Sequence, residues 1–72
     1  MSKFIVLTDG SYTGGLSWLY RFDAEIEPTG DVQPSATKED VTDEFYTVTF
    51  PEDVDGASLL DDCDCVISYD LA

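Results

Sequence analysis

The chain has 72 residues, of which 43% are hydrophobic and nine are aromatic, and it sets sixteen Asp and Glu residues against three Lys and Arg. The hydrophobic content is too high for a disordered acidic tail, and the formal net charge of −13 excludes nucleic acid and anionic membranes as direct partners. We expect one domain over residues 1–72, with a core near the lower size limit for unaided folding, because so short a chain buries only about 60% of its unfolded surface.

The first predicted element is a central strand over residues 3–8 (KFIVLT), a continuous apolar run rich in strand formers. Residues 9–15 (DGSYTGG) follow as a loop, because three of the seven are glycines. This segment lacks the lysine and the spacing of a phosphate-binding loop. Its expected role is therefore a strand connection.

Residues 16–27 show the clearest periodicity, with hydrophobic side chains at the even positions and mostly polar ones at the odd positions. Period two predicts a strand with one buried and one solvated face. A helix over residues 16–22 is the alternative, because Leu16, Leu19 and Tyr20 would then share one side. We favour the strand, in which the aromatic side chains belong to the core: Trp18, Tyr20 and Phe22.

Residues 28–31 (PTGD) have the chemistry of a turn. A short helix over residues 38–45 is expected after it, because Thr37 and Asp40 have the spacing of a capping box. Its helix propensity is marginal, since β-branched residues and Asp are poor helix formers. Four acidic residues would lie on its outer side: Glu39, Asp40, Asp43 and Glu44.

Residues 45–50 (FYTVTF) predict a further strand with Tyr46, Val48 and Phe50 on one face, and Pro51 ends it.

The C-terminal part is predicted as a turn over residues 52–56, one helical turn over residues 58–62, and a last strand over residues 63–71. Alternation in this strand divides its side chains between two faces. The expected inward set is Cys63, Cys65, Ile67, Tyr69 and Leu71. The expected outward set is Asp64, Val66, Ser68 and Asp70. The fold class is therefore α+β, with a three- to four-stranded, mostly antiparallel sheet and one or two short helices on one face.

The carboxylates are predicted to be ordered on the surface. Alternate residues of a strand lie roughly 6.6 Å apart, so outward-facing acids on the two strands would stand in regular columns. We expect these strand-borne carboxylates to bind the partner: Asp61, Asp62, Asp64, Asp23, Glu25 and Glu27. The acids of the expected helix, Glu39, Asp40, Asp43 and Glu44, are the second choice.

Other kinds of site are weaker interpretations. Residues 53–56 (DVDG) resemble the middle of an EF-hand loop, but proline would occupy the first ligand position and Asp the last, where Glu is usual. Cys63 and Cys65 supply two of the four ligands of a thiolate site in a chain without histidine, so core thiols are expected. Paired carboxylates such as Asp61 and Asp62 lack a tuned base or nucleophile beside them. We therefore expect no enzymatic activity, no metal and no cofactor.

A monomeric cytoplasmic protein is expected. The sequence contains no apolar stretch near the ~20 residues of a membrane span, and the residues after Met1 do not have the pattern of a secretion signal. Cys63 and Cys65 lie too close together for an unstrained disulfide and are expected to be reduced. Tyr12 or Tyr69 is the aromatic side chain expected to be exposed and available to a partner.

In size, acidity, α+β build and lack of catalytic residues, the chain resembles the small phage-encoded anti-CRISPR proteins, several of which mimic DNA. In the same general way it resembles inhibitors of uracil-DNA glycosylase and nuclease-immunity proteins. The resemblance implies an inhibitor in the host-cell cytoplasm whose carboxylates occupy the basic nucleic-acid-binding channel of a target, foremost a CRISPR effector complex, and exclude DNA.

Two alternatives stay open. Eleven Asp against five Glu, with only two Lys, also suits a domain adapted to strong brine whose acidity says nothing of its function. An acidic immunity protein or antitoxin that neutralises a basic nuclease is the other. A basic nucleic-acid-binding protein is the expected partner in every interpretation but the halophilic one.

Overall fold

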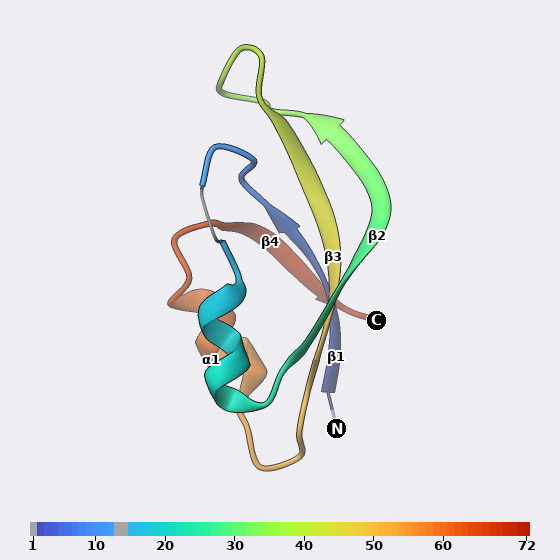
Figure 1. Cartoon of the computed structure of the whole chain (residues 1–72), viewed down its shortest axis with the longest axis vertical. Helices are drawn as coiled ribbons and strands as arrows, with labels where there is room; N and C mark the ends of the chain where they lie inside the picture. The colour runs from blue at the N-terminus through green and yellow to red at the C-terminus, as the bar shows by residue number, and fades with distance from the viewer. Residues whose placement is uncertain (1, 13–14) are drawn as a thin grey trace.

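The computed structural model describes residues 2–12 and 15–72 and has the predicted α+β fold (Figure 1). Four antiparallel strands form one open sheet in the order β2-β3-β1-β4. A 3-10 helix, η1, and one α-helix, α1, pack on the same face of that sheet. The bounds are β1 Ser2–Thr8, η1 Ser17–Phe22, β2 Glu25–Pro34, β3 Thr42–Phe50, α1 Gly56–Asp61 and β4 Val66–Leu71.

Strand β1 is central, as predicted, with β3 on one side and β4 on the other. An inner strand uses both faces, which explains its continuous apolar run. Phe4 and Val6 enter the core beneath the helices, whereas Leu7 is buried without joining that cluster.

The predicted strand over residues 16–27 is wrong, because residues 17–22 form η1 and β2 begins only at Glu25. Leu16 and Leu19 are buried three positions apart, the repeat of a 3-10 helix. Asp23 then takes a left-handed conformation (φ 59°) that ends the helix. The helical alternative was correct for these residues, although Tyr20 does not share the buried side of Leu16 and Leu19. Of the three aromatic side chains assigned to the core, Trp18 packs against it, whereas Tyr20 and Phe22 are exposed.

The predicted turn over residues 28–31 is also wrong, because it lies inside β2. The pairing of β2 with β3 shifts register between Pro28 and Val32, and Gly30 has a φ of 89° there. The turn-forming residues therefore produce a bulge in a long strand, since a bulge can use a glycine in the left-handed region.

The predicted helix over residues 38–45 does not form; residues 35–41 connect β2 to β3, which starts at Thr42. Ser35 Oγ accepts hydrogen bonds from the backbone N–H groups of Thr37 and Lys38. Asp40 has a φ of 61°, which a helix excludes. Pairing with β2 from Thr42 onward outweighs a weak helix propensity.

The later elements follow the sequence more closely. Tyr46, Val48 and Phe50 share the inner face of β3, and α1 lies near the expected helical turn. Both cysteines are buried as predicted, although they precede β4.

Within β4 the predicted alternation holds for Tyr69, which packs against the core, and for the exposed Ser68 and Asp70, but it fails at the other positions. Ile67 is 53% exposed and Leu71 is 77% exposed. A register shift opposite the end of β1 pairs Val66 with Thr8, so Val66 packs against the core in place of Ile67. Leu71 is exposed although its register partner, Phe4, is buried.

The core lies between the sheet and the two helices. Phe4 packs edge-on against Phe50, with ring centroids 5.9 Å apart, and Leu19 and Leu60 bring the helices onto this pair. The opposite face of the sheet carries no helix in the part of the chain that is described (Figure 1). The molecule is elongated, with principal extents of 39 × 19 × 16 Å.

Candidate functional site

Fourteen of the sixteen carboxylates are exposed, while Asp9 is half-buried and Asp43 is buried. Nine of the ten acids predicted to bind a partner are thus accessible, but they do not form the predicted strand-borne columns. Asp61 ends α1, Asp62 caps it, Asp64 follows in a loop and Asp23 caps η1. Only Glu25 and Glu27 lie on a strand at alternate positions.

The prediction that Asp43 contacts a partner is wrong, because Asp43 is only 2% exposed and cannot form part of a contact surface. It lies in β3, not on the outer side of a helix, and its Oδ1 accepts a hydrogen bond of 3.1 Å from the backbone N–H of Gly10. Asp43 therefore holds the loop after β1 in place.

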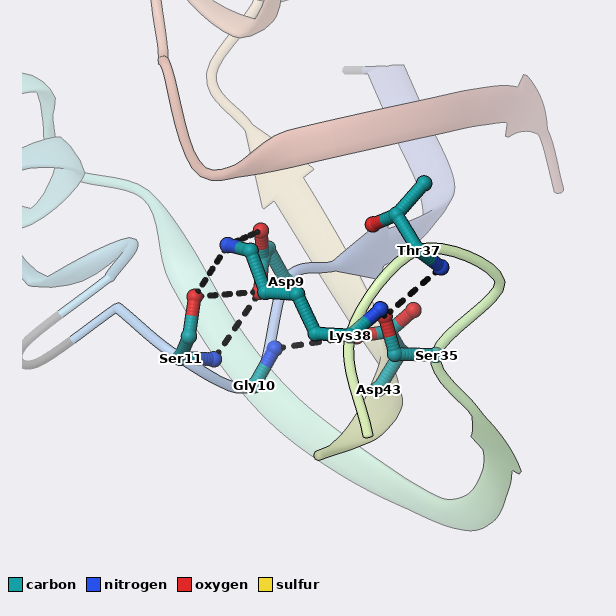
Figure 2. A network of polar contacts seen from close by, with 7 residues as sticks. All are labelled: Asp9, Gly10, Ser11, Ser35, Thr37, Lys38 and Asp43. Atoms are coloured by element: carbon teal, nitrogen blue, oxygen red, sulfur yellow. Dashed lines mark hydrogen bonds and ion pairs between the residues drawn. The ribbon is translucent and has the colours of Figure 1, made fainter. Parts of the chain in front are cut away.

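A polar network surrounds this contact (Figure 2). Asp9 Oδ1 accepts hydrogen bonds from the N–H (2.9 Å) and the hydroxyl (2.7 Å) of Ser11. Lys38 Nζ lies 2.9 Å from Asp9 Oδ2 and donates to Ser11 Oγ at 2.7 Å. The Ser11 hydroxyl first, and then Lys38, lower the pKa of Asp9 to about 2. The network joins the loop after β1 to the β2–β3 connection.

Beside this network lies a hollow of about 360 Å³ between the end of β1, η1, β2 and β3. Three tyrosines from three separate segments line it: Tyr12 from the loop after β1, Tyr20 from η1 and Tyr46 from β3. Two carboxylate residues, Asp9 and Glu44, also line it. We refer to this group of five residues as the tyrosine cleft.

The tyrosine side chains keep much of their surface open. Tyr12 is 49% exposed and Tyr20 is 57% exposed. The hydroxyl of Tyr46 donates to Glu44 Oε2 at 2.7 Å, and this hydrogen bond raises the pKa of Tyr46. Lys38 Nζ lies 5.8 Å from the ring centroid of Tyr12, so one ring of the cleft already contacts a cation.

The sequence missed most of the cleft. Tyr12 was one of the two tyrosines expected to be exposed, and it is, but Tyr20 was assigned to the core and Tyr46 was placed only on one face of a strand. Tyr46 is half-buried at the edge of the core, and Tyr20 lies on the solvent side of η1. No spacing in the sequence brings these rings together, because their segments meet only in the folded chain.

The two cysteines form part of the core. Their Sγ atoms lie 3.0 Å apart, and Trp18 Nε1 donates to Cys63 Sγ at 3.3 Å. Burial, together with the neighbouring thiol, raises the pKa of Cys65 to about 12. Both cysteines are free, and a thiol with so high a pKa is a poor nucleophile near neutral pH.

The EF-hand-like segment, residues 53–56, makes hydrogen bonds inside the fold. Asp55 caps α1, where its two carboxylate oxygens accept hydrogen bonds from the backbone N–H (3.3 Å) and the hydroxyl (2.9 Å) of Ser58. Across residues 2–12 and 15–72, no group of three or more His, Cys, Asp or Glu side chains is arranged to hold a metal ion.

The side chains that line the cleft are phenol rings and carboxylates, and both kinds of group attract cations.

Within the described ranges, no helix is long and apolar enough to cross a membrane. No protein-family model, curated protein or solved structure matches the chain.

Proposed function

We propose that the protein is a non-enzymatic inhibitor whose acidic surface occupies the basic nucleic-acid-binding channel of a target complex and blocks DNA binding. A CRISPR–Cas effector is the proposed target, because its channel holds a guide–target duplex through positive charge. The protein would act in the cytoplasm of the cell that contains this effector.

The linear density of exposed charge carries the proposal. Fourteen exposed carboxylates are distributed over a length of 39 Å, or about one per 2.8 Å. Duplex DNA carries one charge per ~1.7 Å of axis and a single strand one per ~3.4 Å. The protein thus lies between the two in charge density, with only three Lys and Arg residues to offset it.

The shape supports the same proposal. A rod whose other two extents are 19 and 16 Å fits a channel built to surround a nucleic acid. Acidic segments also occur toward both ends of the rod, in the β2–β3 connection and in the turn between β3 and α1 (Figure 1). A channel that encloses the molecule would therefore meet carboxylates along its whole length.

The uncovered sheet face offers the most ordered set of carboxylates. Glu25 and Glu27 pair with Thr49 and Thr47 along one edge strand, and Asp70 lies opposite Ile5 on the other edge. Three strand spacings separate Glu27 from Asp70, which places the two acidic edges roughly 14 Å apart. A sheet holds such positions more firmly than a loop does.

Competition for DNA tests the proposal directly. Guide-loaded CRISPR effectors of several types, with basic nucleases as a comparison set, would be mixed with labelled target DNA at about 0.15 M salt. We expect the protein to displace DNA from one effector type at near-stoichiometric concentration. Polyglutamate of equal total charge is the control for polyanion effects; equal displacement by it, or none by the protein, would contradict the proposal.

Two charge-matched triple variants then test whether position matters. One variant removes three charges from the uncovered sheet face (Glu25→Gln, Glu27→Gln, Asp70→Asn). The other removes three charges from the bulge of β2 and the β2–β3 connection (Asp31→Asn, Glu39→Gln, Asp40→Asn). Rim charges act mainly on association rate, whereas charges seated against a partner act on dissociation. We expect the sheet-face variant to lose at least about tenfold more affinity in titration calorimetry. Equal losses would show that only total charge matters.

A further inference from the structure

We propose that the tyrosine cleft is a binding site for one guanidinium group, and that its occupant in the complex is an arginine side chain of the basic partner. The inference rests on the proposed function for the identity of that partner, but not for the chemistry of the site.

The first reason is the composition of the cleft. Three aromatic rings and two carboxylate residues line a hollow of about 360 Å³, and none of its described lining residues is Lys or Arg. A cation placed over a tyrosine ring is attracted by the negative face of that ring. The volume lies at the small end of the range for ligand sites, enough for one long side chain.

The second reason is the exposure of the rings. Tyr12 and Tyr20 keep about half of their surface open although they flank a concave site. Tyrosine and arginine are both enriched at interaction hot spots, and hot spots on one protein tend to pair with those on its partner.

The third reason is the electrostatic arrangement at the cleft. Lys38 neutralises Asp9 directly through a contact of 2.9 Å and lies over Tyr12. Among the described residues, no Lys or Arg forms an ion pair with Glu44, whose carboxylate accepts a hydrogen bond from the hydroxyl of Tyr46. An incoming cation that reaches Tyr46 would therefore also meet the carboxylate of Glu44, 2.7 Å from the Tyr46 hydroxyl.

Guanidinium suits the site better than ammonium. It is planar, it stacks on aromatic faces and it is more weakly hydrated, and its donors match a carboxylate in a two-pronged contact. We therefore expect the cleft to discriminate between arginine and lysine, which simple charge attraction would not do.

Peptide titrations test the site without the partner. The probes are the capped tripeptides Gly-Arg-Gly, Gly-Lys-Gly and Gly-citrulline-Gly, added to the full chain while ring resonances are followed by NMR. We expect saturable shifts at Tyr12, Tyr20 and Tyr46 with the arginine peptide, weaker ones with lysine and none with citrulline. Shifts spread evenly over the acidic residues, and lost at about 0.5 M salt, would overturn the proposal.

Matched variants locate the binding energy. Glu44→Gln keeps the shape of the cleft and removes one charge, and Tyr20→Leu removes an exposed ring without emptying the core. Each should weaken the arginine peptide by about threefold or more. Asp53→Asn, in the turn beyond the opposite end of β3, removes the same charge as Glu44→Gln and should leave binding unchanged; an equal effect of both would refute a defined site.

The outcomes of this test and of the DNA-competition test are separable. Arginine-peptide binding without DNA displacement keeps the site and refutes the inhibitor. DNA displacement that is insensitive to Glu44→Gln and Tyr20→Leu, with no peptide binding, keeps the inhibitor and refutes the site.

Discussion

At the scale of single residues, identical side chains have opposite roles. Asp43 and Asp40 are three positions apart, and both were predicted to contact a partner. Asp43 is buried and accepts a hydrogen bond from the Gly10 N–H, whereas Asp40 is exposed and has a left-handed backbone conformation. Sequence alone cannot separate them, because the burial of Asp43 depends on a loop thirty-three residues away.

Replacing Asp43 with Ala should destabilise the fold. The substitution leaves the Gly10 N–H without its acceptor, and an unsatisfied hydrogen-bonding group away from water costs about 1–3 kcal/mol. Urea unfolding measures the loss. Glu39→Gln, an exposed neighbour, is the control and should stay within about 0.5 kcal/mol of the parent. A similar small change for Asp43→Ala would mean that the contact is not structural.

Asp9 should titrate unusually low. Its folded pKa of about 2 lies below the ordinary 3.8, so its contribution to stability is complete above pH 4 and is lost as the pH falls toward 2. Carboxyl-carbon NMR titration should show this midpoint. Ser11→Ala and Lys38→Met should each raise the pKa of Asp9, since the Ser11 hydroxyl is the largest single cause and Lys38 contributes both a hydrogen bond and a charge. An unchanged pKa in Ser11→Ala would assign the shift to Lys38.

At the scale of elements, the sequence predicted strands well where β-branched and aromatic residues are concentrated, as in β1 and β3. It failed over residues 16–27, where alternation arises by chance in a 3-10 helix followed by three strand residues. It also failed over residues 38–45, because a pairing partner in β2 overrides local propensity. The candidate site was predicted least, since its three tyrosines belong to separate segments that meet only in the folded chain, and Tyr20 lies in one of the misassigned segments.

The packing of α1 allows a test at the same scale. A Cβ on Gly56, the first residue of α1, would collide with the ring of Phe50, a fully buried core residue. Gly56→Ala improves helix propensity by at most about 1 kcal/mol, but overpacking against a rigid ring costs about 1–3 kcal/mol. We expect net destabilisation in urea unfolding. The double variant Gly56→Ala, Phe50→Leu should recover part of the Gly56→Ala loss; no recovery would place its cause elsewhere.

At the scale of the whole molecule, the net charge of −13 opposes compactness. Salt should therefore raise the melting temperature, because at 0.1 M the repulsion reaches only about 10 Å. We expect a cooperative melt by circular dichroism already at this salt concentration. A chain that is unfolded there and folds only in molar salt would favour brine adaptation over an inhibitory role.

The edge strand β4 gives this charge a second consequence. Within residues 2–12 and 15–72, no strand pairs with its outer side, and Ile67 and Leu71 are exposed along it. It is therefore a template on which a second copy could add. We expect mutual repulsion to keep two such edges apart in neutral solution. Near the isoelectric point of about 4.1 that protection vanishes, and light scattering should then detect self-association that Ile67→Lys suppresses. The acidity that would let this protein enter a positively charged channel thus also keeps its own copies from joining sheet to sheet.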